Sequence, residues 1–162
     1  MKHHLEEEVG DLLVKYNLTI GVAESCTGGL ISNMITNVPG SSRYFLGGVV
    51  AYSNKVKIDT LMVSPETIET YGAVSEEVAS EMARGIRRID RVDIGLAVTG
   101  IAGPDGGTEE KPVGTVYIAL FAQTEGRCSR FSFEGTRMDV KIKTAENALL
   151  MLKNYIMEKY KR

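Results

Sequence analysis

Apolar residues recur along the chain with two alternating periods. Spacings of three and four residues are typical of amphipathic helices, and helices are therefore expected in six places: about 3–17, from Ser25 or Thr27 to 38, from 53–54, from 64–66, from 75 to about 89, and about 137–159. Short apolar runs and strict alternation predict strands at 18–23, 45–52, 92–98, 114–121 and 127–133. The helical spacing also predicts that Ile89 and Ile142 face the core.

This order of elements predicts the class of fold. Strands that alternate with helices indicate an α/β protein, here a three-layer α/β/α sandwich around a mixed sheet of about five or six strands. The sheet is expected to be parallel where helices cross over and antiparallel at a hairpin within 114–133. No repeat or linker-like stretch interrupts the pattern, so we expect residues 1–162 to form a single domain.

Composition and charge exclude several classes of protein. Apolar residues make up 43% of the 162 residues and charged residues 25%, as in ordinary globular proteins. The longest apolar run, 45–52, is far shorter than the roughly 20 residues of a membrane span, and the acidic N-terminal stretch does not resemble a signal peptide. With only two cysteines, Cys26 and Cys128, a reduced cytoplasmic location is expected. A net charge of −2 offers no general attraction for nucleic acid, so no nucleic-acid or membrane partner is expected.

The first candidate site follows the strand expected at 18–23. Ser25 stands there in a turn that leads through Thr27 to Gly28 and Gly29. Backbone N–H groups exposed in such a turn can stabilise a phosphate or a developing oxyanion beside the serine. The alternative is structural: Ser25 or Thr27 caps the next helix, and the glycines only permit close packing.

The second candidate is a glycine-rich loop over 99–112, which follows another strand end and includes Thr99, Gly100 and Gly103. Ligands bind at such strand ends in open α/β sheets. The loop has neither of the common phosphate-binding glycine motifs, so the wall of a small-molecule pocket fits it better than a triphosphate cradle. An ordinary surface loop is the alternative.

Lys55 and Lys57 stand in the first turns of the helix expected from 53–54. A buried lysine near a helix N-terminus can lose its proton close to neutral pH and act as a base toward a serine. Spacing does not choose between the two lysines, and most lysines are simply solvated. A Ser-His-Asp triad or a zinc site is not expected, because the only histidines are His3 and His4 at the terminus.

Six strings of this sequence, taken in order, resemble the C-terminal domain of the CinA family. They are AESCTGG (23–29), GSS (40–42), YSN (52–54), GAVS (72–75), TGIAGPDGG (99–107) and EEKPVGTV (109–116). The resemblance covers about residues 5–155, and the family includes stand-alone nicotinamide-nucleotide amidases of the PncC type. Longer members carry a further domain of molybdopterin-binding type, for which 162 residues leave no room.

The resemblance implies hydrolysis of nicotinamide mononucleotide to nicotinate mononucleotide and ammonia, with no cofactor and no metal. By position, Ser25 matches the family's nucleophile, Lys57 its lysine base and Tyr52 the tyrosine that accompanies them. Arg137 matches an arginine of a late G-x-R motif, a partner for the substrate phosphate, with pairing to Glu134 or Asp139 at the surface as the alternative. Lys141 departs from the arginine that relatives often have there.

Three kinds of function are consistent with these residues. The first is the amidase, assembled as a homodimer or a higher homo-oligomer. The second is a regulatory module that binds a nucleotide without turnover, and the third is an accessory protein of competence or DNA repair. A serine, a lysine and a tyrosine kept together favour the amidase, since a binding module needs no base beside its serine. The near-neutral charge counts against the third.

Overall fold

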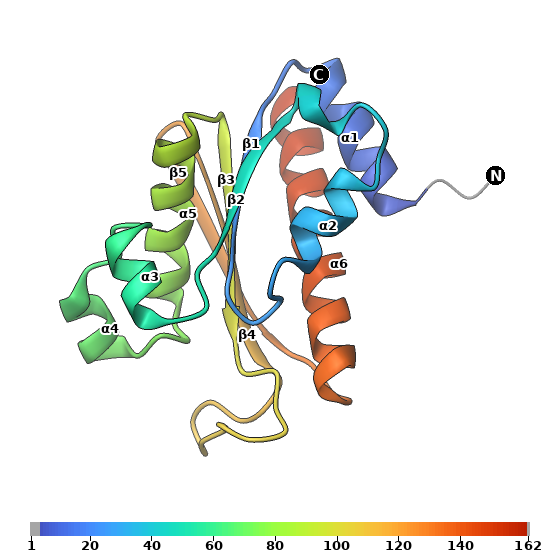
Figure 1. Ribbon diagram of the computed structural model, residues 1–162. Helices are drawn as coiled ribbons and strands as arrows, with labels where there is room; N and C mark the ends of the chain where they lie inside the picture. Colours follow the sequence, from blue (N-terminus) through green and yellow to red (C-terminus); the bar gives the residue numbers. More distant parts are fainter. Residues whose placement is uncertain (1–3, 162) are drawn as a thin grey trace.

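A mixed five-stranded sheet lies between two layers of helices in the computed structural model, which describes residues 4–161 (Figure 1). The strands are β1 (Ile20–Glu24), β2 (Phe45–Val50), β3 (Ile94–Gly100), β4 (Thr115–Ala122) and β5 (Glu125–Ser132). Their spatial order is β2-β1-β3-β4-β5. β1 pairs in parallel with β2 and β3, whereas β4 runs antiparallel to both β3 and β5. The predicted three-layer fold and the 114–133 hairpin are therefore confirmed.

Helices lie on both sides of the sheet (Figure 1). One face carries α1 (Leu5–Lys15), α2 (Leu30–Thr36) and α6 (Arg137–Tyr160). The other carries α3 (Asn54–Asp59), α4 (Pro65–Tyr71) and α5 (Glu76–Asp90). A short 3₁₀ helix, Ser41–Arg43, precedes β2. Among residues 4–161, no helix is both long and apolar enough to cross a bilayer.

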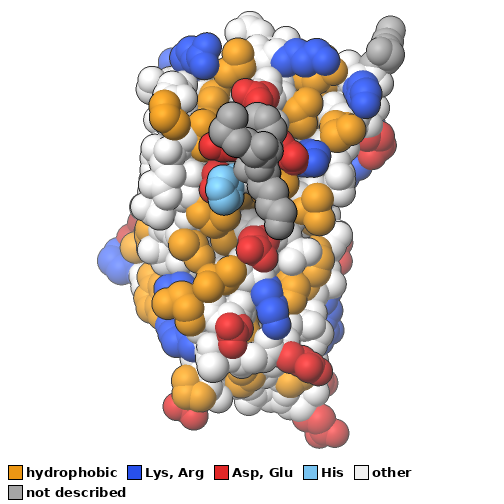
Figure 2. All heavy atoms as spheres, turned by 90° about the vertical axis from the view of Figure 1, so that its right-hand side faces the viewer, with side chains coloured by type: hydrophobic (Ala, Val, Ile, Leu, Met, Phe, Trp, Pro, Cys, Tyr) orange, Lys and Arg blue, Asp and Glu red, His pale blue; other side chains and the backbone are white. Residues whose placement is uncertain are grey.

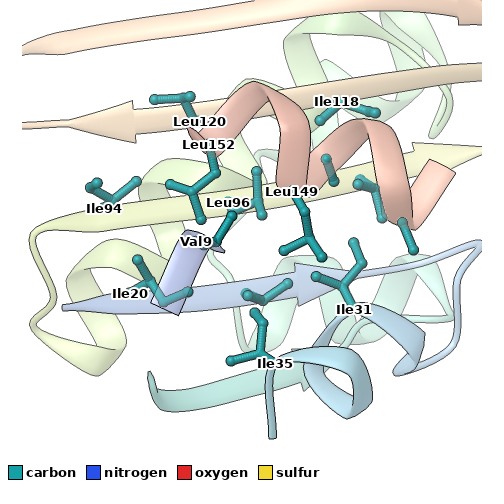
Figure 3. Close-up of a cluster of buried hydrophobic side chains, with 14 of the residues drawn as sticks. Val9, Ile20, Ile31, Ile35, Ile94, Leu96, Ile118, Leu120, Leu149 and Leu152 are labelled. Atoms are coloured by element: carbon teal, nitrogen blue, oxygen red, sulfur yellow. The ribbon is translucent and has the colours of Figure 1, made fainter. Parts of the chain in front are cut away.

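The two faces are packed differently. Against α1, α2 and α6 the sheet presents large aliphatic side chains such as Ile20 and Leu96, which meet Leu149 and Leu152 (Figure 3). Against α5 it presents small residues, and a methyl group added at Gly95 would lie 2.1 Å from a backbone oxygen of α5. α5 therefore lies very close to the centre of the sheet.

Three local expectations are wrong. Neither Ser25 nor Thr27 caps α2, because the helix begins only at Leu30 with Gly29 as its N-cap. Ile142 is 42% exposed, since it lies about 200° around α6 from the buried Val140.

Ile89 is 40% exposed for a related reason. One turn after the buried Ile86, the residue of α5 that faces the sheet is Asp90. Its carboxyl group lies beside Gly21 and Gly47, near the start of β1 and β2. Ile89 is therefore turned away from the sheet.

Candidate active site

Ser25 lies directly after β1, at the carboxyl ends of the parallel strands. Its backbone N–H donates to the carbonyl oxygen of Val98 on β3, 3.1 Å away, which fixes the start of the turn. The residue is only 8% exposed. This end of a parallel sheet is where α/β proteins place ligands.

Lys57 reaches Ser25 from α3, and both residues line a small cavity. Ser53 caps α3 by accepting a hydrogen bond from the N–H of Val56. The Lys57 Nζ donates to the carbonyl oxygen of Ala51 at 2.9 Å and lies 3.1 Å from the Ser25 Oγ. Lys57 is 2% exposed and forms no ion pair with any residue in 4–161.

Burial lowers the pKa of Lys57 below its ordinary value, because the charged ammonium loses its water without gaining a carboxylate. Lys55, by contrast, is exposed and forms an ion pair with Asp59. The structure thus separates two lysines that spacing alone could not distinguish.

Glu24, the last residue of β1, organises the turn that carries Ser25. It is completely buried, and its carboxylate accepts four hydrogen bonds. The Thr27 hydroxyl and the Ile31 N–H donate to Oε1 at 2.7 and 2.8 Å, and the Ser32 hydroxyl and N–H donate to Oε2 at 2.7 and 3.0 Å. Sequence reasoning missed Glu24. The available signal was an acidic residue that ends a buried strand and precedes a glycine turn.

The glycines give this turn its shape. Gly28 and Gly29 have φ values of +61° and +103°, which side-chain-bearing residues rarely adopt. The Gly28 N–H donates to the Ser25 carbonyl oxygen at 3.1 Å, so this N–H closes the turn. A methyl group added at Gly28 would lie 3.7 Å from the Lys141 Nζ, which places that amine next to the turn.

Tyr52 and Arg137 meet at the mouth of the cavity. The Arg137 Nη2 donates to the Tyr52 hydroxyl at 2.9 Å, and its Nη1 donates to the Gly103 carbonyl oxygen at 2.7 Å. Tyr52 is 61% exposed, and its hydroxyl bonds to Arg137 rather than to Ser25 or Lys57. Arg137 pairs with neither of the acids considered from sequence, since Asp139 instead forms a capping box with Thr136.

These side chains enclose a cavity of about 220 Å³. It is lined by Ser25, Cys26, Tyr52, Asn54, Lys57, Ala73, Val74, Thr99, Gly100, Ala102 and Arg137. Of the predicted residues, Thr27, Gly28, Gly29 and Gly103 do not line it: the first three shape the Ser25 turn, and Gly103 holds Arg137. Thr99 donates its hydroxyl to the Ala73 carbonyl oxygen at 2.9 Å and joins two walls of the cavity.

The chemistry of the cavity centres on a hydroxyl and an amine. Cys26 also lines the cavity, but burial raises the pKa of its thiol to about 12, so the thiol stays protonated at neutral pH. In the part of the chain that the structure describes, no cluster of three His, Cys, Asp or Glu side chains could hold a metal ion. Proton transfer between Ser25 and Lys57 is therefore the reactivity that the lining offers.

Comparison with known proteins identifies the family. Residues 2–156 match the family described as CinA C-terminal domain. The chain belongs to this CinA family. A CinA-like protein of Desulfosudis oleivorans is 56% identical over 142 residues, which cover 85% of this chain, and one of Dictyoglomus thermophilum is 51% identical over 153 residues, which cover 94%. The alignments span 34% and 37% of those relatives, so this CinA chain corresponds to little more than a third of their length.

Solved CinA structures share the fold over almost their whole length. A competence damage-inducible protein A from Klebsiella pneumoniae has a TM-score of 0.93 and 33% identity, with 96% of each chain covered. A competence/damage inducible protein from Agrobacterium tumefaciens has a TM-score of 0.88 and 38% identity, with 94% of this chain and 95% of that chain covered. The α/β architecture around the Ser25 cavity is thus the CinA architecture.

Proposed function

We propose that this CinA domain is an amidohydrolase that converts nicotinamide mononucleotide to nicotinate mononucleotide and ammonia. One observation carries the proposal: the Lys57 Nζ lies 3.1 Å from the Ser25 Oγ, buried and without an ion-pair partner in residues 4–161. A module that only binds a nucleotide needs no base beside a buried serine.

In the proposed reaction, neutral Lys57 accepts the proton of Ser25 as Oγ attacks the carboxamide carbon. The negative charge that develops on the amide oxygen is stabilised by backbone N–H groups of the turn that carries Ser25. The Lys57 ammonium then gives its proton to the leaving nitrogen, so ammonia departs and an acyl-enzyme remains. Water, deprotonated by Lys57, cleaves this ester and releases the carboxylate.

The cavity suggests how the substrate is placed. At about 220 Å³ it is smaller than a typical ligand pocket, so it would take the pyridine ring, with the ribose phosphate extending to the mouth. Arg137 is held there by its hydrogen bonds to Tyr52 and Gly103. A guanidinium binds phosphate oxygens through parallel charge-assisted hydrogen bonds.

The test is ammonia release from nicotinamide mononucleotide by the purified chain and by a Ser25→Ala variant. We expect release by the native chain and none by the variant, while the variant keeps its fold and still binds the mononucleotide. Tight binding without ammonia from the native chain would support the regulatory module instead. Turnover by Ser25→Ala would remove Ser25 from the mechanism.

A further inference from the structure

A second concave surface lies on α5, at the end of the sheet opposite Ser25. It measures about 810 Å³ and is lined by four arginines, Arg84, Arg87, Arg88 and Arg91, which we call the arginine groove. Phe121 at the end of β4 and the 61–64 segment after α3 also contribute to its lining. Its volume is within the range of small-molecule sites.

The arginine groove carries a net positive charge, because its lining holds four arginines and two acidic side chains. Among residues 4–161, none of the four guanidiniums forms an ion pair. The two acidic side chains of the lining are already engaged: Glu81 accepts from the Ser64 N–H and the Thr67 hydroxyl, and Asp93 accepts from Thr19.

The helix itself explains only part of this cluster. Cations favour the C-terminal turn of a helix, which accounts for Arg87 and Arg88. Arg84 lies a turn earlier. Arg91 is the C-cap residue at φ +53°, a left-handed conformation in which glycine or asparagine is usual and arginine is costly. The backbone conformation therefore does not favour an arginine at position 91.

The ring of Phe121 contacts two of the four arginines of the groove. The Arg84 and Arg87 guanidinium carbons lie 5.0 and 5.9 Å from the centre of its ring. Such cation–π contacts help to hold the two guanidiniums in place. The Arg87 Nε donates to the Asp93 carbonyl oxygen at 3.0 Å, so its Nη groups and the Arg84 guanidinium are left for an acceptor.

We infer that the arginine groove binds a compact, multiply charged phosphate, such as a di- or triphosphate group. A long nucleic acid fits less well, because the chain carries a net charge of −2 and positive charge is concentrated locally. On the face formed by α1 and α6, for comparison, basic and acidic side chains are interspersed (Figure 2). This inference is independent of the Ser25 chemistry.

Binding of inorganic tripolyphosphate to the full chain, measured by calorimetry, tests the inference. We expect saturable binding that weakens at least tenfold in an Arg88→Ala/Arg91→Gly double variant and is unchanged in Arg43→Ala, a variant of an exposed arginine elsewhere. Absence of binding, or equal binding by the double variant, would overturn it. Ser25→Ala should bind like the native chain whether or not the amidase proposal holds.

A single Arg91→Gly variant separates binding from folding. Glycine suits the left-handed C-cap, so this variant should unfold at the same or a higher temperature and still bind tripolyphosphate more weakly.

Two competitors, a nucleoside triphosphate and duplex DNA, identify the source of the phosphate. If a nucleoside triphosphate displaces tripolyphosphate at a concentration similar to that of tripolyphosphate itself, the groove binds the phosphates alone. If a tenfold lower concentration is enough, the nucleoside adds contacts of its own. Stronger displacement by duplex DNA at equal phosphate concentration would overturn the inference in favour of nucleic acid.

Discussion

Lys57 keeps its amine inside the protein with no carboxylate beside it, and this decides how the proposed reaction should respond to pH. Burial lowers its pKa, so the neutral, proton-accepting form becomes populated below the ordinary lysine value of 10.5. We expect kcat to rise with pH and to level off below pH 10.5, measured as ammonia release. A rise centred on 10.5 would mean that the catalytic lysine is solvated.

The two neighbouring lysines provide a matched pair of variants. Lys57→Ala should reduce kcat nearly as much as Ser25→Ala, whereas Lys55→Ala, which removes only an exposed ion pair with Asp59, should be mild. Because groups that act as a unit are not additive, the Ser25/Lys57 double variant should be little worse than either single variant. Losses that multiply would assign Lys57 to binding rather than to proton transfer.

Arg137 is expected to act on binding. Arg137→Ala should raise the KM for nicotinamide mononucleotide about tenfold or more, since hydrogen bonds to charged groups contribute roughly 1.5–3 kcal/mol. The effect on the dephosphorylated nucleoside should be small. Steady-state kinetics with both substrates decide this, and an equal loss on the two would show that Arg137 acts by holding Tyr52 and Gly103 in place.

Some residues of the candidate site could be predicted from the sequence and others could not. The turn at Ser25 shows in the sequence because glycines follow a strand, but the selection of Lys57 over Lys55 required the resemblance to CinA proteins. The contact between Arg137 and Tyr52 joins residues 85 positions apart, which no local pattern reveals. Glu24 was missed because a buried strand residue is normally apolar, and its four donors become visible only when the turn is folded.

At the scale of elements, Glu24 joins the end of β1 to the start of α2. Glu24→Gln would turn an amide N–H₂ toward donors from Thr27, Ile31 or Ser32, and leaving such groups unsatisfied costs about 1–3 kcal/mol. We expect a lower unfolding temperature together with a larger loss in kcat than in KM, because the Ser25 turn loosens.

Thr27→Val is the control for this variant, since it removes one of the four donors and leaves the carboxylate in place. It should lower the unfolding temperature and kcat less than Glu24→Gln does. A Glu24→Gln variant that is destabilised but has native kcat would limit Glu24 to a structural role.

The elements themselves followed from the sequence where a local signal exists. Ser53, Ser64 and Ser75 each cap a helix as their positions predict. The start of α2 could not be predicted, because Ser25 and Thr27 are capping residue types whose hydroxyls are used by Lys57 and Glu24 instead. Other hydrogen bonds of the two hydroxyls therefore override the capping preference.

At the scale of the whole molecule, the three-layer fold was predictable because the crossover helices α2 and α5 each have a buried apolar stripe. The order of the strands was not, since β1 pairs with β3 across a long separation in sequence. That pairing aligns the ends of β1 and β3 and so places Ser25 near Thr99 and Gly100 in one cavity. The candidate site is therefore a product of the topology.

The buried contact between Ser25 and Lys57 has a consequence for ionic strength. Dissolved ions weaken the interaction between solvent-exposed charges, with a screening length of about 10 Å at 0.1 M. They have little effect where a hydroxyl meets a neutral amine inside the protein. Arg137 is exposed at the mouth of the cavity, so added salt weakens its attraction for a phosphate. Added sodium chloride should therefore raise the KM for nicotinamide mononucleotide and leave kcat nearly constant. A parallel fall in kcat would reveal a charged partner in the chemical step, and a flat KM would mean that the phosphate is held away from solvent.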